Sequence, residues 1–191
     1  MAKSSRSGPA PGRAQADETP RSSRGSVFRF VLVFALVMGG YYAASAIPIY
    51  RDTLFPKYLE LNATVSGGIL RALGQAVQTH GETISEGAVS ISIKKGCDAI
   101  APTMLFVAAV IAFPAPWRRR FIGMFVGAPV LLLINLVRII TLWYARKYAS
   151  VDTFERLHVD VWQPAFIFLA LVLWMIWAMR ALPAPQQEQG A

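Results

Sequence analysis

A few polar side chains in the second half of this sequence could together carry out nucleophilic chemistry. Cys97 is the only cysteine in the chain. Asn135 and Arg138 interrupt one apolar run, and His158 begins another. A thiolate is a nucleophile, an imidazole transfers protons near neutral pH, and a guanidinium can stabilise developing negative charge. These residue types are those of an acyl-transfer site, provided that the fold brings distant positions together.

The composition indicates the kind of protein that must position them. Of 191 residues, 54% are hydrophobic, and the mean hydropathy is +0.42. This is too apolar for an ordinary soluble domain and predicts a small polytopic helical membrane protein in the lipid bilayer. A single cysteine excludes an internal disulfide and a multi-thiolate metal site, and two histidines argue against a zinc site. We therefore expect no metal and no nucleic acid partner, since the basic residues flank apolar runs.

The hydrophobic pattern divides the chain into a membrane domain and two tails. Residues 1–25 are rich in Ser, Pro, Gly and Arg, which predicts a disordered cytoplasmic tail. A transmembrane domain follows over 26–181, with an insertion at 48–97, and 182–191 form a second cytoplasmic tail. We predict an all-α membrane protein with about four spans, at 27–47, 99–113, 121–143 and 158–179. Ala44 and Ala46 resemble a signal-peptidase site, but the long polar leader favours an uncleaved first span.

The basic residues predict the orientation of these spans. Arginines and lysines in the N-terminal tail and the cluster Arg118–Arg120 mark the cytoplasmic side of the membrane. Both termini are then cytoplasmic, although the loop 144–157 also carries three basic residues, which mildly opposes this orientation. In this topology Cys97 and His158 lie at the outer ends of their spans, and Arg138 lies near the outer end of its own. The site is therefore expected at the outer face.

The insertion 48–97 is expected to cover this outer face. Apolar residues between 59 and 77 recur at helical spacing and predict an amphipathic helix. Alternation around Val89–Ile93, with Glu86-Gly87 before it, predicts a small β-hairpin. His80 stands in a turn-like stretch and is interpreted as a solvated loop residue. The pair Gly123 and Gly127 is interpreted as a helix-packing motif.

Each reactive residue also has a structural explanation. Cys97 precedes a helix start and follows Lys94 and Lys95, which would lower the pKa of its thiol, but a lone cysteine is commonly a small buried hydrophobe. Arg138 is costly inside a span unless paired, and could instead extend to the outer headgroups.

Asn135 and His158 also allow more than one interpretation. Asn135 is on the same helical face as Arg138, which favours a polar pocket. His158 could be a general acid and base, or an interfacial histidine beside Trp162.

Taken together, the motifs resemble those of the exosortase and archaeosortase family of membrane cysteine transpeptidases. The resemblance rests on three motifs: "GCDAI" with Cys97, "NLVRII" with Asn135 and Arg138, and "HVDVW" with His158. It covers roughly residues 27–180. The small size of the chain resembles that of the exosortase H branch most. One departure is Ala99, where many members have glycine, and if close backbone approach to the substrate requires that glycine, substrate fit changes here.

The resemblance implies an enzyme that cleaves a C-terminal sorting signal from exported proteins and transfers the product to an acceptor of unknown identity. The signal would comprise a short motif of the I-P-T-L-x-x-W-G sort, one transmembrane helix and a basic tail. Cys97, Arg138 and His158 would be catalytic, Asn135 would orient Arg138 or the substrate backbone, Trp162 would bind substrate or support the site, and no cofactor would be needed. The membrane would be a bacterial plasma (inner) membrane. The alternative is a non-enzymatic assembly factor or small transporter subunit. A rhomboid-type serine protease fits less well, since no G-x-S-x-G-like motif is present.

Overall fold

The computed structural model describes residues 21–181, and the tails predicted over 1–20 and 182–191 lie outside these residues. The described chain is mainly helical, with one small sheet, as expected for an all-α membrane protein. The helices are α1 (Arg21–Ala46), α2 (Phe55–Ala72), α3 (Ile100–Ala112), α4 (Trp117–Tyr148), α5 (Val151–Glu155) and α6 (Gln163–Ala181), with π-helical turns η1 (Tyr50–Leu54) and η2 (Arg156–Trp162). The strands are β1 (Gln78–His80), β2 (Thr83–Glu86) and β3 (Val89–Ser92). Helix α1 thus begins inside the stretch 1–25 that was predicted as a tail.

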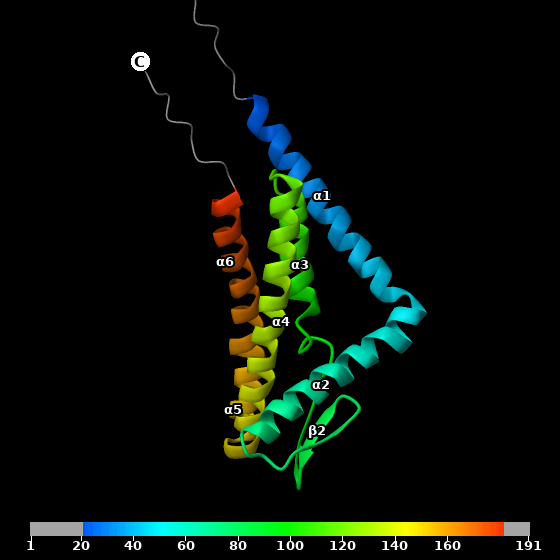
Figure 1. The fold of residues 1–191 in the computed structure, drawn as a ribbon, viewed down its shortest axis with the longest axis vertical. Coiled ribbons are helices and arrows are strands. Elements are labelled where there is room, and N and C mark those ends of the chain that lie inside the picture. Colours follow the sequence, from blue (N-terminus) through cyan, green and yellow to red (C-terminus); the bar gives the residue numbers. More distant parts are fainter. Residues whose placement is uncertain (1–20, 182–191) are drawn as a thin grey trace, which may run out of the picture.

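Helices α3, α4 and α6 form the bundle that supports the site. They lie side by side, with α1 packed against α3 and diverging from the bundle along its length (Figure 1). Arg118–Arg120 lie at the end of the bundle where α1 begins and α6 ends, which we call the basic end. The opposite end, where α2 and the sheet pack against α4, is called the site end. Successive spans run in opposite directions, as predicted, and for this reason the basic cluster and the site lie at opposite ends of the bundle.

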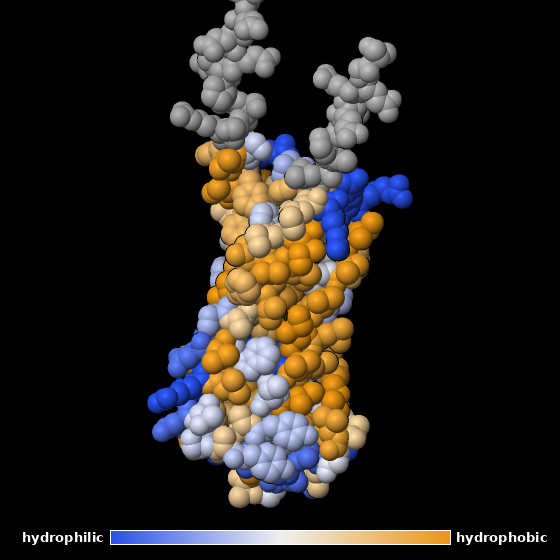
Figure 2. Space-filling view, turned by 90° about the vertical axis from the view of Figure 1, so that its left-hand side faces the viewer, coloured by the Kyte–Doolittle hydropathy of each residue, from blue (hydrophilic) through white to orange (hydrophobic). Residues whose placement is uncertain are grey.

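Within residues 21–181, three helical segments have the length and hydropathy to cross a membrane: Gly25–Ala46, Trp117–Tyr148 and Val151–Ala181. The predicted second span, 99–113, is instead the short apolar helix α3. Its 13 residues extend only about 20 Å, less than the roughly 30 Å of a bilayer core. Figure 2 shows a broad hydrophobic surface between hydrophilic ends, as the membrane prediction requires.

The predicted loop 144–157 is mostly helical. Helix α4 continues to Tyr148, and α5 begins at Val151 after Ser150, whose hydroxyl accepts a hydrogen bond from the Thr153 amide. Serine is a favourable N-cap because its side chain satisfies an amide that the first turn leaves free. Of its three basic residues, Arg146 and Lys147 lie on the last turn of α4, where cations interact favourably with the helix dipole, and Arg156 begins η2.

The insertion contains the predicted amphipathic helix and β-hairpin, with two differences. Helix α2 buries one apolar face, but it ends at Ala72 and not at residue 77, because Gly74 turns the chain with a φ of 84°. The predicted hairpin is present as β2 and β3, which pair Glu86 with Val89 around Gly87. An additional strand, β1, pairs with β2, so His80 is an exposed strand residue and not a loop residue.

Two apolar clusters form the core and meet at the chain segment before α3. The first joins α2, the sheet and the end of α4, and partly buried Cys97 packs against it. The second lies between α3, α4 and α6 and includes Ala99. Gly123 and Gly127 help form the bundle, since a Cβ at either position would overlap the ring of Trp177 or Phe106. The packing interpretation of this glycine pair is therefore confirmed.

Candidate active site

The site is built around the loop between β3 and α3. The Cys97 amide bonds to the Lys94 carbonyl at 2.9 Å, and Gly96 adopts a φ of 97°, so the chain turns sharply at the cysteine. A left-handed φ of this kind is readily adopted only by glycine. The loop therefore presents Cys97 at the site end, immediately before the first turn of α3.

Asp98 holds this loop in place. Its two carboxylate oxygens accept hydrogen bonds from the amides of Ile100 (2.8 Å) and Gly96 (3.1 Å). The Tyr58 hydroxyl, from α2, donates to the Asp98 carbonyl oxygen at 2.7 Å. Asp98 is only 4% exposed, so these contacts satisfy a buried acid and a helix N-terminus together. Sequence reasoning did not identify Asp98, although an acidic residue just before a helix start is a typical capping signal.

Ala99 follows with a left-handed backbone, at φ 58° and ψ 6°. Among the described residues it is the only non-glycine residue with a positive φ. This conformation costs an L-amino acid about 1–2 kcal/mol. The glycine that the resemblance implies at this position would adopt this backbone without that cost. The methyl group of Ala99 packs into the second apolar cluster.

Arg138 reaches this loop from α4. Its guanidinium donates to the Gly96 carbonyl oxygen at 3.1 Å, and its other terminal nitrogen lies 3.8 Å from the Cys97 sulfur. The guanidinium carbon also lies 5.7 Å from the centre of the Phe166 ring, within cation–π range. Arg138 is 1% exposed, so its side chain is directed into the protein and the alternative of an arginine extending to the headgroups does not fit.

His158 completes the group from the last membrane-spanning segment. Its Nε2 atom is in hydrogen-bond contact with the Cys97 sulfur, although 61 positions separate the two residues. The imidazole also lies against Phe154, with ring centres 5.8 Å apart. His158 belongs to the π-helical turn η2, and such wide turns are frequent at functional sites. The predicted meeting of Cys97, Arg138 and His158 is present.

Asn135 is not hydrogen-bonded to Arg138, and the roles predicted for Asn135 and Trp162 stay predictions. Asn135 is fully buried, and its amide nitrogen donates to the Asn62 side-chain oxygen at 3.4 Å, so its partner is in α2 and not Arg138. Trp162 packs beside Phe166 in the second apolar cluster, with ring centres 6.5 Å apart. Asn62 was missed, because an asparagine within an amphipathic pattern gives no signal of its partner.

The thiol environment differs from the expectation. Burial raises the pKa of Cys97 above its ordinary value, the Arg138 guanidinium lowers it, and the charges of Asp98 and Glu155 raise it further. Lys94 and Lys95 are exposed to solvent, and the start of α3 is capped by Asp98. The prediction of a thiolate favoured by two lysines and the helix start is therefore wrong. A neutral thiol beside an imidazole can instead lose its proton during attack.

No group of three His, Cys, Asp or Glu side chains suited to a metal ion occurs within 21–181. The expectation that no cofactor is needed stays a prediction. What the geometry offers is a sulfur nucleophile, a proton acceptor in contact with it, and a fixed cation beside it.

Comparison with known families agrees with this arrangement. A family model described as transmembrane exosortase (Exosortase_EpsH) matches residues 24–177. The chain belongs to the transmembrane exosortase family. The matched region contains all three residues that meet at the site, so this exosortase has them within its family domain. No curated protein and no solved structure gives a significant match. The resemblance in the sequence is thus confirmed for the family, and the assignment to the H branch, based on size, stays a prediction.

Proposed function

We propose that this exosortase is a cysteine transpeptidase that cleaves a C-terminal sorting signal from exported proteins. The observation that carries the proposal is the position of the Cys97 sulfur, which contacts His158 Nε2 and lies 3.8 Å from an Arg138 nitrogen. A nucleophile, its base and a charge-stabilising donor are the parts that acyl transfer requires.

Acylation begins with the neutral thiol. Cys97 Sγ forms a bond to the scissile carbonyl carbon while His158 Nε2 accepts the thiol proton, which requires the neutral imidazole protonated on Nδ1. The oxyanion develops beside the Arg138 guanidinium, which the Gly96 carbonyl holds in one orientation. The carbon–nitrogen bond then breaks, the proton on His158 passes to the leaving amine, and a thioester remains on Cys97.

Deacylation reverses these roles. An acceptor amine, or water, loses a proton to His158 and attacks the thioester carbonyl. The carbon–sulfur bond breaks, and the sulfur regains its proton. The acceptor decides whether the product is anchored or released, and no part of the sequence identifies it.

The proposed substrates are exported proteins that end in a short recognition motif, one transmembrane helix and a basic tail. The enzyme sits in the bacterial plasma membrane with the basic end in the cytoplasm and the site end at the outer face. Support comes from the basic cluster Arg118–Arg120 in the first turn of α4, since α4 begins at the opposite end of the bundle from the start of α3, which Cys97 precedes (Figure 1). Such clusters favour the cytoplasmic side.

The test compares the two histidines of the chain. A reporter ending in an I-P-T-L-x-x-W-G motif, a transmembrane helix and a basic tail is co-expressed with each variant, and its cleavage is followed by a mass shift on gels. His158→Ala should abolish processing, whereas His80→Ala, a change in an exposed strand residue, should not. Processing by His158→Ala at the wild-type rate would reject His158 as the base, whereas absence of processing by the wild type would favour a non-enzymatic role.

A further inference from the structure

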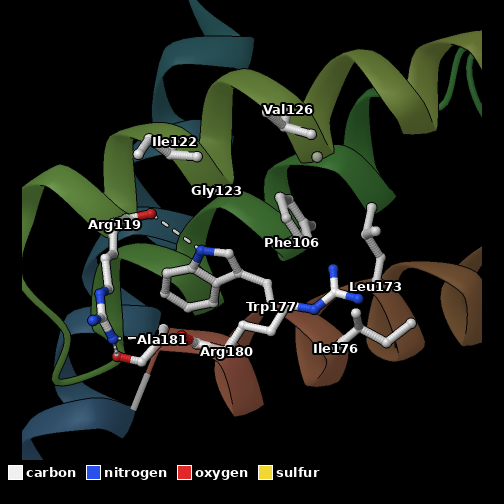
Figure 3. Close-up of a pocket in the computed structure, with 11 residues that line it drawn as sticks. Phe106, Arg119, Ile122, Gly123, Val126, Leu173, Ile176, Trp177, Arg180 and Ala181 are labelled. Atoms are coloured by element: carbon white, nitrogen blue, oxygen red, sulfur yellow. Dashed lines mark hydrogen bonds between the residues drawn. The ribbon is translucent and has the colours of Figure 1, made fainter. Parts of the chain in front are cut away.

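A groove at the basic end is separate from the site. It has a volume of about 410 Å³ and lies between α3, α4 and α6. Figure 3 shows its apolar walls, with Ile122 and Val126 from α4 facing Leu173 and Ile176 from α6. Ile122 and Val126 are 62% and 60% exposed, so this groove opens toward the hydrophobic surface that a bilayer would contact.

Two arginines line this groove, with their guanidinium groups on either side of the Trp177 ring (Figure 3). Arg119 donates to the carbonyl oxygens of Ala181 (2.7 Å) and Arg180 (3.4 Å), which anchors the last turn of α6. The side chain of Arg180 extends back along α6 toward Leu173, over the apolar wall (Figure 3). Neither guanidinium has a carboxylate within salt-bridge distance among the residues the structure describes. The groove thus combines a place for a hydrocarbon chain with the Arg180 guanidinium over its wall and the Arg119 guanidinium at the end of α6.

We propose that this groove binds an anionic phospholipid, with an acyl chain along Ile122 and Val126 and the phosphate at Arg180. Basic pockets between membrane helices recognise lipid headgroups in this way, through local charge attraction and apolar contact. Charge complementarity selects this occupant over a second transmembrane helix with a basic tail, because such a tail would place like charges beside Arg119 and Arg180. The proposal does not depend on the transpeptidase activity.

The role of the arginine charge is tested on the full chain purified in detergent, and native mass spectrometry measures the lipid that it retains. The probes are phosphatidylglycerol and phosphatidylcholine with identical acyl chains, added in equal amounts. The wild type should retain phosphatidylglycerol preferentially, and Arg180→Gln should lower that retention about fivefold. Arg118→Gln is the matched control, because it removes one charge from the same end without altering the lining of the groove.

The shape of the groove is tested by filling it. Val126→Trp should lower retention of phosphatidylglycerol, whereas Phe125→Trp, on an exposed neighbour outside the groove, should not. Thermal unfolding of each variant checks that the bundle is intact. Equal retention of the two lipids, equal losses in Arg180→Gln and Arg118→Gln, or full retention by folded Val126→Trp would each overturn the proposal.

Discussion

Arg138 ties α4 to the loop that carries Cys97, because its guanidinium donates to the Gly96 carbonyl oxygen at 3.1 Å. The same group lies 3.8 Å from the Cys97 sulfur. One planar side chain thus both fixes the turn before the cysteine and places a donor beside the sulfur. Both contacts need the fork of a guanidinium, which an ammonium group does not provide.

Arg138→Lys should therefore resemble Arg138→Ala more than the wild type. Loss of a donor to the developing oxyanion lowers the rate about a hundredfold, and lysine restores charge without the two directed contacts. The initial rate of reporter processing measures this, with Arg146→Lys on the same helix as the control. Processing by Arg138→Lys at the wild-type rate would show that charge alone is sufficient.

The raised pKa of Cys97 predicts its pH dependence. Burial favours the neutral thiol, so at neutral pH the thiolate fraction is smaller than that of a free cysteine, whose pKa is about 8.5. Alkylation by a small neutral maleimide should rise with pH and reach its midpoint above that value. Because Arg138 lowers the pKa, Arg138→Ala should move the midpoint further upward. A midpoint below that of a cysteine peptide would contradict the buried neutral thiol.

Removing the charge of Asp98 should change the reactivity of the Cys97 thiol in the opposite direction from Arg138→Ala. Its negative charge raises the pKa of Cys97, so Asp98→Asn should lower that pKa and accelerate alkylation at neutral pH. The asparagine side chain offers one acceptor oxygen in place of two, so one buried amide loses its partner at a cost of about 1–3 kcal/mol. Alkylation rates and thermal unfolding should thus change together. Asp160→Asn, at an exposed position, is the control, and identical behaviour of the two variants would refute this role.

The left-handed backbone of Ala99 predicts that glycine at this position will change the stability of the protein little. Ala99→Gly removes a buried methyl group, worth about 0.8 kcal/mol, but it relieves a left-handed conformation that costs about 1–2 kcal/mol. Its unfolding free energy should stay within about 1 kcal/mol of the wild type. Ala108→Gly, a buried position within α3, loses the methyl group and helix propensity together and should lose about 1.5 kcal/mol. Equal destabilisation would argue against strain at Ala99.

Much of the site could be predicted because span order alone decides which end of the bundle a residue reaches. Cys97 precedes one apolar helix, Arg138 lies late in the next, and His158 opens the last, so alternation brings them to one end. The hairpin was equally accessible, since Glu86-Gly87 and the alternating residues after it are local signals.

Other features depend on contacts that periodicity does not encode. Whether the start of α3 favours a thiolate depends on which side chain caps it, and Asp98 does so in place of Cys97. The partner of Asn135 depends on how α2 crosses α4, which brings Asn62 within reach. Strand β1 is three mainly polar residues, too short for an alternating pattern to be recognised.

The most direct test of the central claim is substrate processing by Cys97→Ala. The full-length variant is co-expressed with the reporter, and both cleavage and any hydroxylamine-sensitive adduct between enzyme and reporter are measured. If Cys97 is the nucleophile, the wild type should form the adduct, and Cys97→Ala should give neither cleavage nor adduct. Cleavage of the reporter by Cys97→Ala at the wild-type rate would contradict this role of Cys97.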